Sequence, residues 1–217
     1  SKTRDLTYVA LGVAVVTVCA WISIPVGDVP FTLQTLAVAA IGGILGWKKG
    51  LLTILIYILL GLIGVPVFAG FKSGVLHKGV PALMGATGGY IFGFAFAVVI
   101  SGLAKLIPVK NKFARIGVFF AANILGLTIC YVFGTAWFIT VYGKNVGSIG
   151  VKSALMLCVV PYIVPDLVKL FIAAGFWPIG APILLTAYIK SEKEKQRKRI
   201  ERNKKELGRL WNSRRKK

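Results

Sequence analysis

The stretch that decides the fold is residues 30–64, PFTLQTLAVAAIGGILGWKKGLLTILIYILLGLIG. Two apolar runs, over 30–47 and 50–64, flank the basic pair Lys48 and Lys49. A helix of about 20 predominantly apolar residues can cross a bilayer. The first run is close to this length, and the second is short for a span. The stretch therefore predicts two neighbouring membrane helices joined by a short basic turn.

The segment that follows is rich in Gly and Pro. It begins with VPVFAGF at 65–71 and ends with ATGGYIFGF at 86–94, where it runs into another apolar span. Irregular backbone is tolerated near hydrocarbon only where it lines a cavity enclosed by protein. Gly88 and Gly89 allow either a close approach of the backbone to a ligand or close packing of helices. This segment therefore predicts a small-molecule site covered by a loop.

The whole composition is that of an integral membrane protein. Hydrophobic residues make up 56% of the chain and charged residues 16%, whereas a soluble domain carries about 25% charged residues. Residues 152–163 are too few to cross the bilayer, so we expect a re-entrant or interfacial segment there. Pro165 suits the first turn of the helix that follows. The predicted fold is all-α with six transmembrane helices, over 6–24, 30–47, 50–64, 88–107, 114–141 and 165–189.

The distribution of Lys and Arg predicts the orientation. With the N-terminus inside, 22 basic residues fall on the cytoplasmic side, and four fall outside. Basic residues concentrate in cytoplasmic segments, which favours both termini inside. Fourteen of the 22 lie in 190–217, so we expect domain 1–189 to be followed by a helical tail on anionic lipid rather than on nucleic acid.

Asp166 is the only acidic residue within a predicted span, and Lys169 lies three positions later on the same helix face. Charged residues inside a membrane are costly and usually functional. The two side chains could form a purely structural pair. Alternatively, Lys169 would attract a ligand carboxylate and Asp166 would accept hydrogen bonds from a ligand N–H.

Other residues near the same depth could complete such a site. The aromatic candidates would supply apolar walls, whereas each polar candidate could instead brace two helices. The chain has no metal-ligand cluster, no nucleophile–base pair in a span and no GxxxxGK[ST] motif, so we expect no cofactor, metal or catalysis. The remaining candidates are Phe31, Thr32, Gln34, Phe68, Thr87, Tyr90, Asn123 and Tyr162.

Four pieces of this chain resemble the BioY family, the biotin-specific S components of energy-coupling factor (ECF) vitamin transporters. The pieces occur in the family's order, with Ala86 and Pro165 standing where the family usually has proline and glycine. They are PFTLQT at 30–35, YILLGLIGVPVFAGF at 57–71, ATGGYIFGF at 86–94 and PYIVPDLVK at 161–169.

The resemblance implies a six-helix S-component fold in the bacterial cytoplasmic membrane. Biotin would bind with high affinity near the outer face, under loop 1 (residues 25–29) and loop 3 (residues 65–87). Asp166 would bind its ureido N–H groups, and Lys169 would bind its carboxylate.

The family also implies partners, a transmembrane coupling subunit and two cytoplasmic ATPases, with Ala10 and Ala14 on the partner face. Two alternatives stay open at this point. One is an S component for another water-soluble vitamin, and the other is a membrane scaffold or lipid-surface adaptor acting through its basic tail.

Overall fold

The computed structural model describes residues 2–25, 29–73, 82–109 and 111–175, together with seven residues between 194 and 204. The chain divides into two compact units, Ser1–Pro178 and Ile179–Lys217. The seven described residues of the second unit are helical and exposed, and the rest of the predicted tail lies outside the described residues. The first unit carries the helices and the cavity described below.

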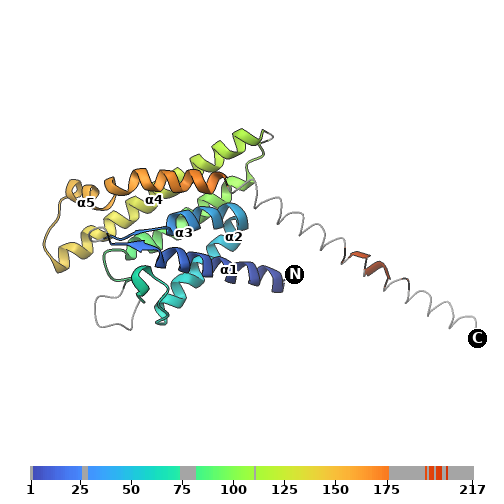
Figure 1. Cartoon of the computed structure of the whole chain (residues 1–217), viewed down its shortest axis with the longest axis horizontal. Coiled ribbons are helices and arrows are strands. Elements are labelled where there is room, and N and C mark those ends of the chain that lie inside the picture. Colours follow the sequence, from blue (N-terminus) through green and yellow to red (C-terminus); the bar gives the residue numbers. More distant parts are fainter. Residues whose placement is uncertain are drawn as a thin grey trace, which may run out of the picture. The chain divides into compact units, whose positions relative to one another are not determined.

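Within the described residues, four helices are long and apolar enough to cross a membrane. A fifth span is possible because two shorter helices, bent by 43° at Val159, pass the same test together. Figure 1 shows the helices of this unit running side by side. They are α1 (Lys2–Trp21), α2 (Gln34–Leu62), α3 (Gly88–Leu103), α4 (Lys112–Asn145), and the bent pair α5 (Val151–Cys158) and Val160–Gly175.

Helix α2 consists of two arms that fold back on each other. Its backbone leaves helical geometry at Gly46, with φ 78° and ψ 172°. The amide of Gln34 donates to the Tyr57 hydroxyl at 2.8 Å, although 23 residues separate the two in sequence. The two arms correspond to the two spans predicted over 30–47 and 50–64. The chain reverses at Gly46, just before the predicted basic turn at Lys48 and Lys49.

Close packing and one lysine stabilise this reversal. Gly42 and Gly50 face each other across the arms, since a Cβ on Gly50 would lie 3.6 Å from the Gly42 Cα. Lys105 donates from Nζ to the Ile44 carbonyl at 3.2 Å. That carbonyl belongs to the last turn before Gly46, where backbone carbonyls have no hydrogen-bond partner within the helix.

Helix α3 packs against both α2 and α4. Val98 and Ser101 on this helix are fully buried, and the Ser101 hydroxyl donates to the Ala39 carbonyl of α2 at 2.9 Å. The 3-10 turn η2 (Ala104–Leu106) then ends the helix. A buried hydroxyl that is hydrogen-bonded across two helices costs little and fixes their register.

Two short strands replace the predicted end of the first helix and the predicted start of the second. β1 (Ser23–Ile24) pairs antiparallel with β2 (Phe31–Thr32), so α1 ends at Trp21 and α2 begins at Gln34. Strand pairing satisfies backbone groups that the helices would otherwise have to satisfy. A 3-10 turn, η1 (Ala69–Phe71), lies in the segment after α2.

The predicted start of the last helix at Pro165 is wrong. The helix begins at Val160, one residue after α5 ends at Cys158. The first turn therefore holds Pro161, whose missing N–H costs nothing there, and Pro165 lies one turn further on. The predicted interfacial segment 152–163 thus comprises α5 and the first turn of this helix, and the predicted end at 189 lies outside the described residues.

Candidate functional site

A cavity of about 250 Å³ lies between β2, the start of α2, α3, α4 and the Val160–Gly175 helix. Segments of loop 3 on both sides of its undescribed part complete the wall. Small-molecule sites commonly measure about 300–1,000 Å³, so this cavity suits a small ligand. Eight of the twelve predicted binding residues line it: Thr32, Gln34, Phe68, Thr87, Tyr90, Tyr162, Asp166 and Lys169.

Asp166 and Lys169 form a buried ion pair at this cavity. Their exposed fractions are 4% and 5%, and Lys169 Nζ donates to Asp166 Oδ1 at 2.7 Å. Burying a charge without a partner is costly, and pairing it with further hydrogen bonds offsets much of that cost. The predicted pair therefore exists at the predicted spacing, and it faces the cavity.

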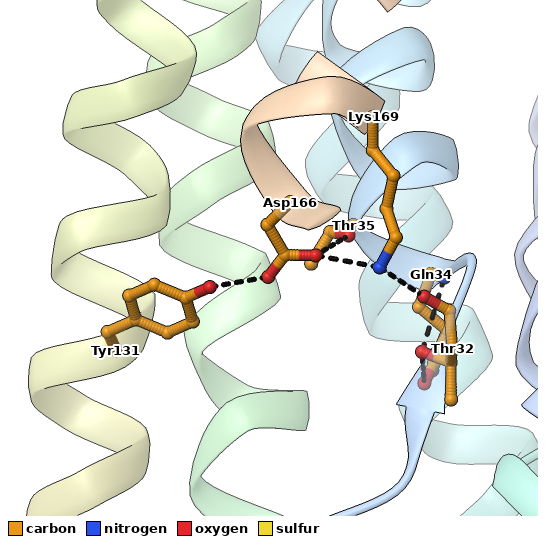
Figure 2. A network of polar contacts seen from close by, with 6 residues as sticks. All are labelled: Thr32, Gln34, Thr35, Tyr131, Asp166 and Lys169. Atoms are coloured by element: carbon orange, nitrogen blue, oxygen red, sulfur yellow. Dashed lines mark hydrogen bonds and ion pairs between the residues drawn. The ribbon is translucent and has the colours of Figure 1, made fainter. Parts of the chain in front are cut away.

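Two hydroxyls complete the shell around the carboxylate. Thr35 donates from Oγ1 to Asp166 Oδ1 at 2.9 Å, and Tyr131 of α4 donates to Oδ2 at 2.5 Å. Figure 2 shows Tyr131 reaching Asp166 from one side and Lys169 from the other. Three donors thus stabilise the charged form of Asp166. Oδ2 accepts one hydrogen bond from the described residues, which leaves it acceptor capacity toward the cavity.

The ammonium of Lys169 makes two hydrogen bonds and one contact with an aromatic ring. Besides Asp166, Nζ donates to the Thr32 carbonyl at 2.6 Å and lies 3.8 Å from the centroid of the Phe31 ring. An ammonium has three N–H groups, and the face of an aromatic ring attracts a cation. Phe31 therefore contributes through Lys169, although it is not among the residues that line the cavity.

Strand β2 is held in place by a second polar network. The Thr32 hydroxyl donates to Gln34 Oε1 at 3.1 Å, and the Gln34 amide donates to the Tyr57 hydroxyl. Tyr57, which is fully buried, donates in turn to the Val67 carbonyl at 3.1 Å. This network links β2 to loop 3. It places the Thr32 carbonyl where Lys169 needs an acceptor.

Two predicted tyrosines supply walls, and their hydroxyls are already bonded. Tyr162 donates to the Val29 carbonyl of loop 1, which joins the Val160–Gly175 helix to that loop. Tyr90 and Thr135 share a hydrogen bond of 3.2 Å between α3 and α4. Thr87 also lines the cavity, with its hydroxyl directed at the Ala82 carbonyl at 3.4 Å.

Gly88 and Gly89 serve packing in this structure rather than the cavity wall. A Cβ on Gly88 would lie 2.0 Å from the Leu83 carbonyl oxygen, and one on Gly89 would lie 2.3 Å from the Trp137 Cβ. Trp137 donates from its indole N–H to the Gly85 carbonyl at 3.1 Å. The two glycines therefore let loop 3 and the start of α3 close against α4.

Asn123 and the two alanines of α1 lie apart from the main cavity. Asn123 donates to the Phe119 carbonyl of its own helix at 2.8 Å and lines a separate small cavity of about 20 Å³. Ala10 and Ala14 are exposed on one face of α1, whereas Gly12 is buried. A Cβ on Gly12 would lie 2.9 Å from the Thr53 side chain.

The sequence interpretation missed Thr35, Tyr131 and Lys72, all of which line the cavity. Thr35 closes the PFTLQT motif, and Tyr131 is a polar side chain in an apolar span, so both carried a weak signal. Lys72 was counted only as one of the four basic residues on the outer side. Within the described residues, no cluster of His, Cys, Asp or Glu could hold a metal ion.

The chain matches a known protein family over most of its length. The profile of the BioY family matches residues 1–184. A probable biotin transporter BioY of Pyrococcus horikoshii is 40% identical over 168 residues, which cover 77% of this chain and 90% of that protein. The biotin transporter BioY of Thermotoga maritima is 39% identical over 79% of this chain and 92% of its own length.

A solved structure shares the fold. The crystal structure of the S-component for biotin from an ECF-type ABC transporter superposes with a TM-score of 0.66 at 26% identity. The match covers 81% of this chain and 89% of that chain.

Proposed function

This chain belongs to the BioY family, and we propose on that basis that it is the biotin-binding S component of an ECF-type transporter. Its relatives are named as biotin transporters, and the family places the chain in the cell membrane as a multi-pass protein. One observation carries the choice of ligand. It is the buried carboxyl group of Asp166, which lines the cavity and keeps an acceptor site on Oδ2.

The proposed role of Asp166 is to accept a ureido N–H of biotin. A hydrogen bond to an ionised acceptor is roughly twice as strong as one between neutral groups. Within the described residues, Thr35, Tyr131 and Lys169 leave one acceptor site on Oδ2. A ligand N–H at that site would complete the shell of the carboxylate without displacing a protein donor.

The apolar part of the ligand would lie against the apolar walls. Biotin carries a thioether ring and an aliphatic chain, and both gain free energy when they leave water. The cavity wall offers aromatic and aliphatic surface from three directions: Phe68 of loop 3, Tyr90, Ile91 and Phe94 of α3, and Leu127 of α4. This combination of apolar walls and a few polar groups is typical of small-molecule sites.

We further propose six spans with both termini inside and biotin bound near the outer face under loops 1 and 3. The ratio of 22 to 4 basic residues supports this orientation. The folded-back arms of α2 support counting two spans there. Lys105 lies at the reversal of α2, opposite the end at which Gln34 meets the cavity.

The proposed partners are those of ECF transporters, a transmembrane coupling subunit and two ATPases. Ala10 and Ala14 present a small-residue surface on the exposed face of α1, which would allow close approach of a partner helix. We also propose that the tail, residues 190–217, binds anionic lipid through its 14 basic residues.

A calorimetric titration tests the choice of ligand. The protein would be purified in detergent, freed of co-purified ligand by refolding, and titrated separately with biotin, thiamine and riboflavin. We expect saturable one-to-one binding of biotin at nanomolar strength and no heat from the other two. Binding of thiamine or riboflavin without biotin would keep the fold and contradict the ligand.

A further inference from the structure

Loop 3 places a second cation at the cavity. Lys72 lines the wall and is exposed, unlike Lys169. No residue that the structure describes makes an ion pair or a side-chain hydrogen bond with the Lys72 ammonium. The charged side chains that line the cavity are Lys72, Asp166 and Lys169. Because Asp166 and Lys169 neutralise each other, the described part of the wall carries one net positive charge.

The Lys169 ammonium is already surrounded by partners within the protein. Its Nζ donates to Asp166 Oδ1 and to the Thr32 carbonyl, and it lies 3.8 Å from the centroid of the Phe31 ring. A ligand carboxylate that approached this ammonium would compete with these partners. It would also lie beside the carboxylate of Asp166, and two like charges at close range repel each other.

We propose that Lys72, rather than Lys169, recognises the carboxylate of the ligand. The inference rests on the proposed function, and it pairs each polar end of the ligand with a different charged side chain of the cavity. The ureido group would meet Asp166 at the buried end, and the carboxylate would meet Lys72 at the exposed end. Lys169 would serve as the fixed counter-ion of Asp166.

Loop 3 holds Lys72 at the wall by its backbone. Lys72 and Phe68 form an isolated antiparallel bridge, in which the Phe68 N–H donates to the Lys72 carbonyl at 3.0 Å. Between them, Gly70 and Phe71 have positive φ values of 67° and 57°. Left-handed geometry at a bulky residue is rare and persists only where the surroundings fix it.

Trp21 at the end of α1 holds this part of loop 3 in place. Its indole N–H donates to the Pro66 carbonyl at 2.9 Å, and its ring stacks on Phe71 with centroids 4.9 Å apart. The loop is therefore anchored to α1 before and after Phe68. Lys72 follows the second anchor directly, so its backbone is fixed beside the cavity and only its side chain needs to adjust to a ligand.

Comparison of charged and neutral ligands tests the assignment. Biotin and its neutral methyl ester would be titrated into the parent protein, Lys72→Gln and Lys72→Arg. Lys144→Gln serves as the control, because Lys144 is also an exposed lysine but does not line the cavity. We expect the parent and Lys144→Gln to bind biotin about two- to fivefold more tightly than the ester, in line with one partly exposed charge pair.

The expected result for Lys72→Gln is loss of this preference, with unchanged affinity for the ester. Lys72→Arg should retain it. The inference is overturned if Lys72→Gln keeps the full preference for biotin, or if Lys169→Met abolishes the preference while Lys72→Gln does not. A parent protein that binds neither compound would instead contradict the proposed function, so the two failures are distinguishable.

Salt dependence gives a second test that needs no variant. The preference of the parent for biotin over the ester should shrink between about 0.05 and 0.5 M salt, because screening acts strongly on exposed pairs and weakly on buried ones. A preference that stays constant over this range would place the carboxylate at the buried Lys169 and overturn the inference.

Discussion

The hydroxyl of Tyr131 and the carboxylate of Asp166 are joined by a hydrogen bond of 2.5 Å between α4 and the Val160–Gly175 helix. Tyr131 is the sole donor that the described residues offer to Oδ2. The other oxygen, Oδ1, accepts from Thr35 and Lys169. The position and the charge of Asp166 therefore depend on α2, on α4 and on its own helix.

Removing the Tyr131 hydroxyl should destabilise the protein. Tyr131→Phe would leave Oδ2 without its protein donor, and an unsatisfied buried acceptor costs about 1–3 kcal/mol. Thermal unfolding in detergent should show a lower melting temperature. Tyr142→Phe on the same helix is the matched control, since no described residue hydrogen-bonds its hydroxyl. Equal melting temperatures for the two variants would contradict the role of Tyr131.

Breaking the buried ion pair should cost far more than breaking an exposed one. Asp166→Asn leaves the Lys169 charge without its partner, which should cost on the order of 3–5 kcal/mol of stability. Asp5→Asn is the control. The Asp5–Lys49 pair has a similar separation, 2.6 Å, but its side chains are 47% and 39% exposed. Such a pair contributes about 0–1 kcal/mol.

A double variant separates the loss of the pair from the loss of one charge. Asp166→Asn combined with Lys169→Met removes both charges, so no unpaired ion remains buried. Its melting temperature should exceed that of Asp166→Asn alone, because replacing both partners of a buried pair is often nearly neutral. Additive losses from the two substitutions would show that the pair is not coupled.

The pair of Asp166 and Lys169 could be predicted from the sequence alone. A charged residue in an apolar span stands out, and a spacing of three residues places its partner on the same helix face. The two arms of α2 were also predicted, because the basic pair Lys48 and Lys49 interrupts the apolar run.

The sequence could not show which hydroxyls face the site. Most polar side chains within membrane helices can bond to their own backbone, as Thr128 does with the Ile124 carbonyl and Asn123 does with the Phe119 carbonyl. Thr35 and Tyr131 instead cross to another helix, and only the helix packing distinguishes the two cases. The start of the last helix was missed for a similar reason, because Pro161 and Pro165 suit a first turn equally well.

The glycine pair at the start of α3 should tolerate no side chain. Gly89→Ala would place a Cβ 2.3 Å from the Trp137 Cβ, and overpacking of this kind costs about 1–3 kcal/mol. Gly117→Ala on α4 is the control, because no atom lies within 4 Å of its added Cβ and alanine favours a helix by about 1 kcal/mol. We expect a lower melting temperature for the first variant and an equal or higher one for the second.

The basic tail should be dispensable for ligand binding. A chain that ends at residue 189 lacks the 14 basic residues of 190–217. It should bind biotin as the full chain does and lose the extra affinity of the tail for anionic lipid, about 1 kcal/mol for each basic residue near the surface. A synthetic tail peptide, co-sedimented with phosphatidylserine and phosphatidylcholine vesicles, measures the lipid term directly. Loss of biotin binding on truncation would favour an adaptor acting through the tail.

The most direct test of the account concerns the ureido group and Asp166. Biotin and its two N-methyl derivatives, each lacking one ureido N–H, would be titrated into the parent protein and into Asp166→Asn. We expect one derivative to bind the parent about 100-fold more weakly than biotin, since it leaves a buried charged acceptor unsatisfied. In Asp166→Asn this difference should shrink to about tenfold or less, because the acceptor is no longer ionised. If both derivatives bind the parent as tightly as biotin does, Asp166 does not recognise the ureido group and the central claim is contradicted.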